Sequence, residues 1–415
     1  MAALSLVHGS KTDIGIVRKR NEDCLLVDEQ IQLFVVCDGV GGREGGDIAS
    51  RIACEFIGDR LREYRSMLLD ASERQTGLNK REIAQLIEHA VSDASGEIRA
   101  QARQTPSLHG MATTCALLLV VGNHAFVAHV GDSRIYLIRH NTMHLLTEDH
   151  SVLNDLKRRG RDPDRSNLGA RYKSALTRAL GVLDSARVDS LDLDLVEGDR
   201  LVICSDGAYG VMPETVFQAI IQRGDADETA HGLIETALQH GGPDNITAIV
   251  VDAKLEAGQS RAIKVQRSLE ALQAVSMFRY LPYADLIRVA SVSTEVRIEA
   301  GSHVIREGEM GESLFVIVEG KAVVSRHGAL LAELETGAHF GEMSLIERKP
   351  RSADIIASTD LSALVIQRDA FFSLLRQEVT AVKLLWGLVR MLNARMVQAN
   401  DELTTLRKLV EGHDA

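Results

Sequence analysis

Two stretches of the sequence place an aspartate directly after an apolar run. "LFVVCDG" ends in Asp38 and Gly39, and "RLVICSDG" ends in Asp206 and Gly207. Each apolar run is typical of a buried strand, so each carboxylate would stand at a strand end. Burying an ionised carboxylate is costly unless a cation or hydrogen bonds compensate. If the two strands are neighbours, they would build a site for a hard divalent cation, with glycine allowing close approach of the backbone.

Further carboxylates stand at the starts and ends of other expected strands. They are Glu22 and Asp23 in "RKRNEDCLLV", Asp132 in "HVGDSR" and Asp244 in "GGPDNITAIVV". A single Asp-Gly pair is more often a hairpin turn than a metal ligand. Several acidic residues beside strong strands in one domain favour a metal site instead. Because no cluster of His or Cys accompanies these oxygens, we expect Mg²⁺ or Mn²⁺ rather than Zn²⁺.

A second group of residues that could do chemistry lies in "FGEMSLIERKPRSAD", residues 340–354. It contains Glu342 and Arg351, and the "MSLI" between them is long enough for one helical turn. Free amides at a helix start and an arginine can hold an anion, while a carboxylate can accept a hydrogen bond from a ribose hydroxyl. This group fits a sugar phosphate, although a glutamate and an arginine at this spacing more often form a surface ion pair.

The first group must be positioned by the elements of the first part of the chain. Its strand-like runs are "LFVVCD", "TCALLLVV", "HAFVAHVGDSRIYLIR", "RLVICSDG" and "ITAIVV". Two amphipathic helices are expected around residues 48–56 and 83–94, and both should lie against a sheet. Because most strands follow one another with few helices between them, we expect an α+β fold rather than a doubly wound parallel sheet.

The second group belongs to a different part of the chain. After a polar, weakly periodic stretch, one or two short helices are expected, broken at Pro282. Over residues 294–368 short strands alternate with glycine turns, which is typical of a small β-domain of barrel or roll type. The tail from Ala370 is helical and carries an apolar stripe that continues to Val410. We therefore expect a first domain over 1–254, a linker over 255–272 and a second domain with a C-terminal helix over 273–415.

The composition limits the classes of partner. The 415 residues carry a formal net charge of −11, which argues against a broad nucleic-acid surface. The five cysteines are scattered without a CxxC pair, which is typical of a reducing compartment. The longest apolar run, "CALLLVV", is too short to span a bilayer. We expect a soluble cytoplasmic protein that binds neither DNA nor membranes.

The motifs of the first part follow one another in a specific order: "VRKRNED", "CDGVGGREGGDIAS", "GMATT", "VGDSR", "LTEDHS", "LTRALG", "CSDG" and "GPDN". Over residues 9–253 the chain resembles the metal-dependent protein serine/threonine phosphatases of the type 2C class. The resemblance implies an α-β-β-α sandwich with a two-metal cleft between the sheets. It also implies hydrolysis of phosphoserine or phosphothreonine by a water that two metal ions activate, without a protein nucleophile.

The resemblance also assigns roles to single residues of this sequence. Asp38 would bridge two Mn²⁺ or Mg²⁺ ions, the carbonyl of Gly39 would join one of them, and Asp206 and Asp244 would join the other. Among the remaining matched residues, Glu22 and Asp23 would hold metal-bound waters, Arg18 would bind the substrate phosphate, and Asp132 would be a ligand of a weaker third metal.

Three features depart from the type 2C pattern. Val40 stands where some members have a histidine that donates a proton, so the leaving group must be protonated by metal-bound water or by another group. Gly210 stands where many members have an acidic residue beside the third metal, which would weaken that site. The flap, residues 158–181, lacks the usual His-Pro pair, so substrate contacts there do not transfer.

The segment "GSHVIREGEMGESLFVIVEGKAVV" and the group after it resemble the cyclic-nucleotide-binding domain of bacterial transcription regulators, ion channels and kinase regulatory subunits. The resemblance implies that Glu342 takes the ribose 2′-hydroxyl and Arg351 the cyclic phosphate. Ser352 does not decide between cyclic AMP and cyclic GMP. In the cassette as a whole, amides of Gly341, Ser352 and Ala353 would complete the site, while Ser344 and Asp354 replace a usual alanine and threonine. Asp354 beside an anion would weaken binding.

Together these observations favour a Mn²⁺- or Mg²⁺-dependent protein phosphatase with a C-terminal cyclic-nucleotide sensor. Its protein substrates would include a serine/threonine kinase or the targets of one. The apolar stripe of the tail helix would pack against the β-domain or form the seam of a homodimer. Two alternatives remain open at this point: a cyclic-nucleotide-responsive scaffold with a degenerate site, and a metallohydrolase acting on a small phosphoester.

Overall fold

The structure, a computed structural model, describes residues 4–40, 45–73, 78–159, 175–255, 259–375 and 378–411. The chain divides into two compact units, Met1–Gln259 and Ser260–Ala415, and each has a hydrophobic core of its own. A membrane-crossing helix is not found among the described residues, because none of their helices is both long and apolar enough.

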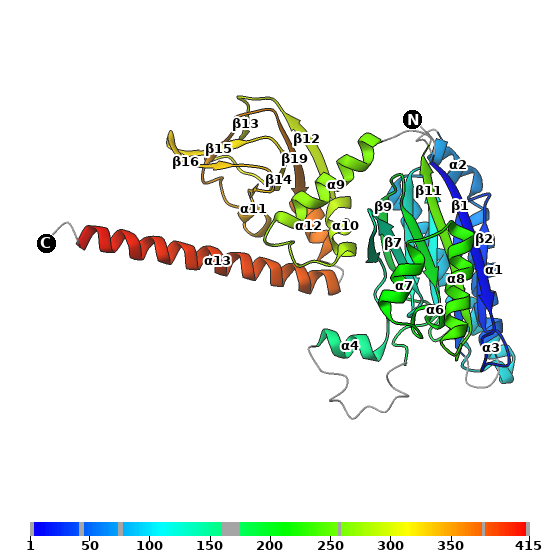
Figure 1. Cartoon of the computed structure of the whole chain (residues 1–415). Helices are drawn as coiled ribbons and strands as arrows, with labels where there is room; N and C mark the ends of the chain where they lie inside the picture. The colour runs from blue at the N-terminus through cyan, green and yellow to red at the C-terminus, as the bar shows by residue number, and fades with distance from the viewer. Residues whose placement is uncertain are drawn as a thin grey trace. The chain divides into compact units, whose positions relative to one another are not determined.

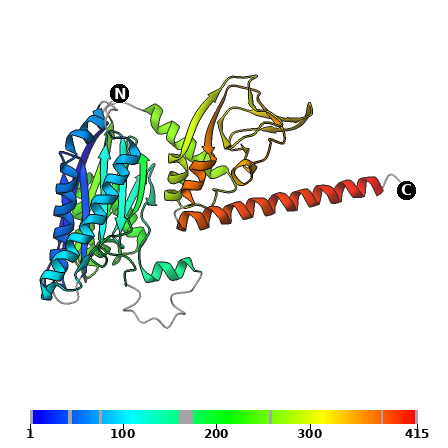
Figure 2. The same cartoon turned by 180° about the vertical axis from the view of Figure 1, so that it is seen from behind.

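The first unit contains two antiparallel sheets between two layers of helices, as Figures 1 and 2 show from opposite sides. One sheet is formed, in spatial order, by β1 (Leu4–Asp13), β11 (Ile246–Leu255), β10 (Arg200–Cys204), β7 (Arg134–Arg139) and β8 (Thr142–Leu145). The other is formed by β2 (Asp23–Asp28), β3 (Leu33–Val40), β5 (Cys115–Val121), β6 (His124–Val130) and β9 (Asp189–Asp194), with β4 (Ala112–Thr113) paired to β3. The predicted α-β-β-α sandwich is confirmed.

The helices of this unit cover the outer faces of the sheets. α1 (Gly46–Arg62) and α3 (Lys80–Gln104) lie over β2, β3 and β6, whereas α8 (Ala226–Gln239) lies over β1 and β11. Because β5 and β6 have a helix layer on one side and the second sheet on the other, every residue of both strands is buried. The remaining helices among the described residues of the unit are α2 (Arg65–Glu73), a 3₁₀ turn at Pro106–Leu108, α4 (Val152–Arg158), α6 (Asp206–Tyr209) and α7 (Glu214–Ile221).

One of the strand-like runs is divided between the two sheets. The run "HAFVAHVGDSRIYLIR" forms β6 in one sheet and β7 in the other, and the chain crosses between them at Gly131 and Asp132. Gly131 has a φ of 112°, and a Cβ there would approach the side chain of Thr114 to 2.6 Å. The crossing therefore requires glycine, and it carries Asp132 into the space between the sheets.

The second unit is built on two four-stranded antiparallel sheets. One has the order β12 (Ser293–Ile298), β19 (Leu361–Gln367), β14 (Ser313–Glu319) and β17 (His339–Phe340). The other has the order β13 (His303–Ile305), β18 (Asp354–Ala357), β15 (Ala322–Arg326) and β16 (Ala329–Leu334). The β-domain expected as a barrel or roll is thus a roll, and its described strands do not close into a barrel.

Helices flank the roll: α9 (Gln259–Ala274), α10 (Tyr283–Ser291), α11 (Met343–Ile346), α12 (Arg368–Leu374) and α13 (Glu378–Glu411). Most of the stretch expected as a linker is helical, since it lies in α9. The first turns of α13 are fixed to α10 through Asp285, which is 2% exposed. Its carboxylate accepts hydrogen bonds of 2.8 Å from Thr380 Oγ1 and from Lys383 Nζ.

Candidate active site

A pocket of about 650 Å³ opens in the first unit, where strands of both sheets end. It gathers seven of the eight residues that the sequence assigned to the metal and phosphate chemistry: Arg18, Glu22, Asp38, Gly39, Asp132, Asp206 and Asp244. The eighth, Asp23, is not in its wall but pairs with Asp38 across β2 and β3. Residues up to 226 positions apart in the sequence therefore meet at one place, as Arg18 and Asp244 do.

Asp38 is held by its backbone at the end of β3. Its amide donates a 2.9 Å hydrogen bond to Thr114 Oγ1, and its carbonyl accepts one of 2.9 Å from Thr113 Oγ1. Thr114 Oγ1 in turn lies 2.6 Å from Ser133 Oγ, next to Asp132. Sequence reasoning quoted "GMATT" as a motif without a role; the structure makes these threonines positioning residues for the pocket carboxylates.

The two Asp-Gly pairs need glycine because other backbone segments lie against them. A Cβ on Gly39 would come within 2.1 Å of the carbonyl oxygen of Gly46, at the start of α1. A Cβ on Gly207 would come within 2.0 Å of the carbonyl oxygen of Asn245. Any side chain at either position would push the strand end away from its neighbour and displace the adjoining aspartate.

Asn245 fixes the loops around the pocket, and sequence reasoning did not single it out. Its Oδ1 accepts a 2.8 Å hydrogen bond from the amide of Glu22, while its Nδ2 donates to the carbonyls of Ile14 and Arg20 at 2.8 and 2.9 Å. One side chain thus ties the segment that carries Arg18 and Glu22 to the start of β11. Its place in "GPDN", directly after Asp244, was the only signal available in the sequence.

The pocket carries uncompensated negative charge. Asp38 is partly buried, and its desolvation together with the carboxylates of Asp23 and Asp206 holds its pKa well above the usual range. Burial raises the pKa of Asp132 to about 7, with a further contribution from Asp206. Burial, followed by repulsion from Asp244, also raises the pKa of Asp206. These carboxylates lack the positive charge that would let all of them ionise together.

Asp23 shows the same lack of compensation in its hydrogen bonds. Its Oδ2 accepts a 2.7 Å bond from Ser205 Oγ, but within the described part of the chain its buried Oδ1 has no partner. Burial raises the pKa of this carboxyl to about 7. Arg18 supplies one positive charge at the rim, where Nη2 lies 2.7 Å from Asp244 Oδ2 and Nη1 lies 3.7 Å from Glu22 Oε2.

These residues fit a hard divalent cation, because they offer only oxygens and their charge is unmatched. They do not close around a single point: the described residues contain no compact group of three or more His, Cys, Asp or Glu side chains. The carboxylates instead line an open pocket, in which carbonyl oxygens and waters would complete the coordination of an ion, as is usual for Mg²⁺.

A network of charged residues braces the loop that carries Asp132. Arg134 forms a two-pronged contact with Asp149, at 2.8 and 2.7 Å, and its guanidinium lies 3.8 Å from the ring centroid of Tyr209. Tyr209 Oη donates a 2.9 Å hydrogen bond to the carbonyl of Asp132. Arg134 in "VGDSR" and Asp149 in "LTEDHS" are thus explained as supports for the Asp132 loop.

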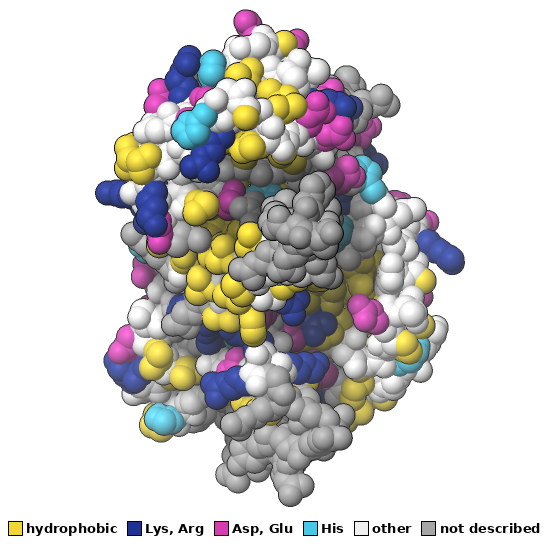
Figure 3. Space-filling model, turned by 90° about the vertical axis from the view of Figure 1, so that its left-hand side faces the viewer, with side chains coloured by type: hydrophobic (Ala, Val, Ile, Leu, Met, Phe, Trp, Pro, Cys, Tyr) yellow, Lys and Arg dark blue, Asp and Glu magenta, His cyan; other side chains and the backbone are white. Residues whose placement is uncertain are grey.

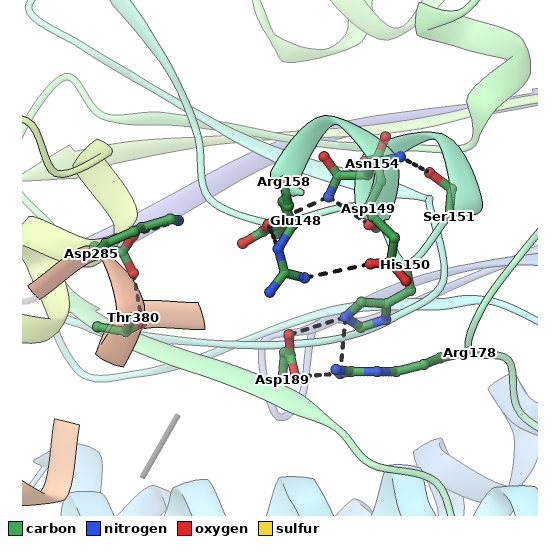
Figure 4. A network of polar contacts seen from close by, with 12 residues as sticks. Glu148, Asp149, His150, Ser151, Asn154, Arg158, Arg178, Asp189, Asp285 and Thr380 are labelled. Atoms are coloured by element: carbon green, nitrogen blue, oxygen red, sulfur yellow. Dashed lines mark hydrogen bonds and ion pairs between the residues drawn. The ribbon is translucent and has the colours of Figure 1, made fainter. Parts of the chain in front are cut away.

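His150 continues this bracing toward the pocket wall, as Figure 4 shows. Its Nδ1 accepts a 3.1 Å hydrogen bond from the amide of Gly131, and its Nε2 lies 3.0 Å from Asp189 Oδ2. Arg178 of "LTRALG" lines the pocket and donates to Asp189 at 2.7 Å. Most of the flap, residues 160–174, lies outside the described residues.

In the second unit, the cassette forms a turn and a short helix beside β14. Gly341 has a φ of 82°, and Glu342 is 6% exposed. The guanidinium of Arg351 donates to Ser344 Oγ at 2.7 Å, to the carbonyl of Ser313 at 3.0 Å and to that of Gly341 at 3.3 Å. Gly341, Glu342 and Arg351 therefore meet, and the exposed Ser352 and half-buried Ala353 follow in the same turn.

The carboxylate of Asp354, expected to disfavour a bound anion, makes a hydrogen bond with the backbone. Its Oδ1 accepts a 2.9 Å hydrogen bond from the amide of Glu307 at the turn after β13. This backbone contact compensates part of the charge that was expected to disfavour an anion.

Two family models match the chain. A model described as protein phosphatase 2C matches residues 18–235, and one described as cyclic nucleotide-binding domain matches residues 295–378. The chain belongs to the protein phosphatase 2C family. It also carries a C-terminal cyclic nucleotide-binding domain.

Individual relatives agree with this membership. The serine/threonine phosphatase stp of Listeria welshimeri is 35% identical over 249 residues, which are 59% of this chain and 95% of the relative. The crystal structure of the serine/threonine phosphatase PstP/Ppp of Mycobacterium tuberculosis has a TM-score of 0.52 and 30% identity, covering 60% of this chain and 99% of that one. A second structure, the PstP catalytic domain in complex with two manganese ions, has a TM-score of 0.50 and 30% identity.

The protein is therefore a serine/threonine protein phosphatase of the 2C class, and the prediction of an enzyme is confirmed. Its pocket retains the acidic set expected for the class, while two positions differ from it. Val40, 46% exposed, lines the pocket where a histidine was expected in some members. Gly210 lies at the end of α6, where its amide bonds to the carbonyl of Asp206 at 2.7 Å.

Proposed function

We propose that the phosphatase unit removes phosphate from phosphoserine and phosphothreonine of proteins by means of two divalent cations, Mn²⁺ or Mg²⁺. The observation that supports this most strongly is the group of partly buried carboxylates with raised pKa values around one pocket. Bound divalent cations would offset the repulsion between these carboxylates. A purely structural role would not explain why so many of them lie together.

Within this proposal each residue has a stated part. Asp38 would contact both cations, the carbonyl of Gly39 would contact one, and Asp206 and Asp244 the other. When bound, the pair of cations lowers the pKa of a water between them and screens the charge of the phosphoryl oxygens. The acidic residues that line the pocket or lie beneath it, Glu22 and Asp23, would hold further waters by accepting hydrogen bonds.

Arg18 would bind the phosphate of the substrate. A guanidinium can grip two phosphoryl oxygens at once, and the half-exposed Arg18 stands at the rim. Its present partners are Asp244 and Glu22. Asp244 would bind a cation and Glu22 a water, so both would attract the guanidinium less strongly and leave it free for the phosphate. Arg18 would thus join the metal ligands to the substrate.

A third cation would bind weakly beside Asp132. The carboxyl of Asp132 lines the pocket beside other acidic residues, which favours a cation, but Gly210 supplies no second carboxylate. We expect this site to be occupied only at high metal concentration.

For the second unit we propose that cyclic AMP or cyclic GMP binds at Gly341, Glu342, Arg351, Ser352 and Ala353. Arg351 would neutralise the cyclic phosphate, and Glu342 would accept the ribose hydroxyl. Ligand binding would shift the helices that flank the roll and so change the activity of the phosphatase. We retain the proposed division into 1–254, 255–272 and 273–415, with part of the middle segment helical.

We further propose a cytoplasmic location and protein substrates that include a serine/threonine kinase or its targets. All five cysteines are free thiols, which suits a reducing compartment.

A phosphatase assay tests the proposal. The full chain is given a phosphothreonine peptide and, in parallel, a small phosphoester and a cyclic nucleotide, each with Mn²⁺ and with a chelator. We expect release of phosphate that depends on Mn²⁺, with a higher turnover on the peptide than on the other substrates. We also expect the rate to change on adding cyclic AMP or cyclic GMP. Faster turnover of the small phosphoester at matched concentration would contradict the protein substrate, and no turnover would favour a scaffold.

A further inference from the structure

Helix α13 has an inner face that packs against its own unit. Leu384, Gly387 and Met391 are buried on this face. A Cβ on Gly387 would come within 2.0 Å of the carbonyl oxygen of Met277, so the helix approaches the segment before α10 as closely as a backbone can. The inner face, together with the Asp285 contacts, accounts for how α13 is attached to the roll.

A second apolar face of the same helix has no partner in the described structure. Its members are exposed and follow one another at intervals of three and four residues, with one seven-residue step at the end. They are Val382 (61%), Leu385 (49%), Val389 (53%), Leu392 (45%), Met396 (60%) and Leu403 (54%), here called the outer stripe. These spacings are those of the a and d positions of a heptad repeat.

The helix also continues far beyond the body of its unit, as Figures 1 and 2 show. After Met391, every side chain of α13 whose exposure is described is exposed. Figure 3, seen from the end toward which α13 runs, shows that hydrophobic side chains are exposed on this face of the molecule, and the exposed fractions above give the members of the outer stripe. Because most helices owe their stability to packing of an apolar face, a projecting helix with an open stripe needs a partner along its length.

We propose that the outer stripe joins two copies of this chain in a parallel, two-stranded coiled coil. Val382 and Val389 occupy a positions, while Leu385 and Leu392 occupy d positions. β-branched residues at a with leucine at d favour two parallel strands. A strict seven-residue period keeps the stripe facing a helix of the same period, which a second copy supplies and an irregular surface does not.

The flanks of the stripe suit the same arrangement. In a parallel pair each e position borders the seam, and the e positions with described side chains are Trp386, Asn393 and Asn400. None of these carries a charge that would repel its equivalent in the other copy. Trp386 is 63% exposed in the single chain and would cover the edge of the seam.

This dimer would bring two nucleotide-binding units together, because the first turns of each α13 helix are attached to its own unit. The outer stripe is separate from the phosphatase pocket and from the cassette, so the proposal stands whether or not the proposed function holds.

The first test measures the mass of the full chain by sedimentation velocity and by light scattering. We expect a dimer for the wild type and for Ala394→Glu, a matched control on the exposed side of the same helix away from the stripe. We expect Leu392→Glu to be mainly monomeric, with the dissociation constant raised by about tenfold or more, because the change buries a charge at a d position. A monomeric wild type, or a Leu392→Glu protein that stays dimeric, would overturn the proposal.

Trp386 is the single tryptophan of the chain, and its fluorescence reports on the seam directly. On dilution of the wild type, or in Leu392→Glu, its emission should move to longer wavelength as the indole becomes exposed to water. The emission of Ala394→Glu should match that of the wild type. If the wild type dissociates on dilution and the Trp386 emission does not change, the two copies do not meet along the outer stripe.

The parallel direction is tested by cross-linking. Val389→Cys should form an intermolecular disulfide on mild oxidation by oxidised glutathione, because equivalent a positions face one another in a parallel pair. Ala394→Cys, placed outside the stripe, should not. Absence of the Val389→Cys cross-link in a dimeric sample would exclude the parallel register, and binding of a monomeric wild type to anionic lipid vesicles would assign the stripe to a membrane surface instead.

Discussion

The two candidate sites differ in how their charges are satisfied. Around the phosphatase pocket, the buried Asp23 and the partly buried Asp38 lie beside other carboxylates, and their pKa values are raised. In the cassette, Arg351 already donates hydrogen bonds to Ser344, Ser313 and Gly341. The phosphatase pocket carries negative charge that bound cations would neutralise. In the cassette, Arg351 must give up hydrogen bonds within the protein before it can bind a cyclic phosphate. We therefore expect the first to depend steeply on its cations and the second to bind with moderate affinity.

The largest effect is expected when the pocket loses a carboxylate. Asp206→Asn should lower Mn²⁺-dependent hydrolysis of a phosphopeptide by about 100-fold or more, because a ligand and a negative charge are both lost. Steady-state rates over a range of Mn²⁺ concentrations measure this. The matched control is Asp227→Asn on α8, whose side chain is 68% exposed and which should keep wild-type rates. Wild-type turnover in Asp206→Asn would show that the metal assignment is wrong.

A loss of about tenfold or more in cyclic-nucleotide affinity is expected for Arg351→Ala, which corresponds to ~1.4 kcal/mol. The change removes the cation that would meet the cyclic phosphate. Calorimetric titration with cyclic AMP and cyclic GMP gives the affinities, and Arg348→Ala, whose side chain is 66% exposed, serves as the control. Equal binding by wild type and Arg351→Ala would contradict the cassette.

The stability of the metal-free protein should fall as the pH rises. The carboxyls of Asp23 and Asp132 have pKa values of about 7 in the folded chain, well above their unfolded values of about 4. Between these limits the folded state binds more protons, so raising the pH from about 4 to about 7 favours unfolding. Thermal melting in a chelator, repeated with Mn²⁺, should show this slope flattened by the metal. A chelated protein that becomes more stable over this window would show that the carboxylates are already compensated.

The smallest effect is expected for Ser344→Ala. Its hydroxyl accepts a hydrogen bond from Arg351, so removing it should free the guanidinium and tighten cyclic-nucleotide binding by roughly threefold. The folded second unit should lose about 1 kcal/mol of stability at the same time. Calorimetry and chemical denaturation measure the two quantities. Weaker binding would mean that the Ser344 hydroxyl contacts the ligand itself. The hydrogen bond between Ser344 and Arg351 would then not compete with the nucleotide.

Much of the fold could be read from local patterns, and the errors have local causes. α8 was not predicted, although Ala226, Ala230, Leu233, Ile234 and Ala237 are buried at helical spacing. The apolar run over β6 and β7 did not show that its two halves belong to different sheets, because continuous hydrophobicity does not reveal a change of sheet. Only Gly131 marked that crossing, and a lone glycine in a strand does not specify it.

The sequence by itself determined the residue types on which the chemistry depends. These are patterns of neighbouring residues, so they can be recognised without the fold. They include the apolar runs ending in Asp-Gly, the ordered acidic motifs, the Glu–Arg cassette and the apolar stripe of the tail helix. The tertiary structure decided what those residues meet. It brought Asp38, Asp132 and Asp206 to one pocket from a strand, a loop and a helix start, made Thr114, Ser133 and Asn245 their supports, and turned Arg351 toward Ser344. Burial and pKa shifts depend on neighbours distant in the sequence, so only folding could decide which charges are compensated.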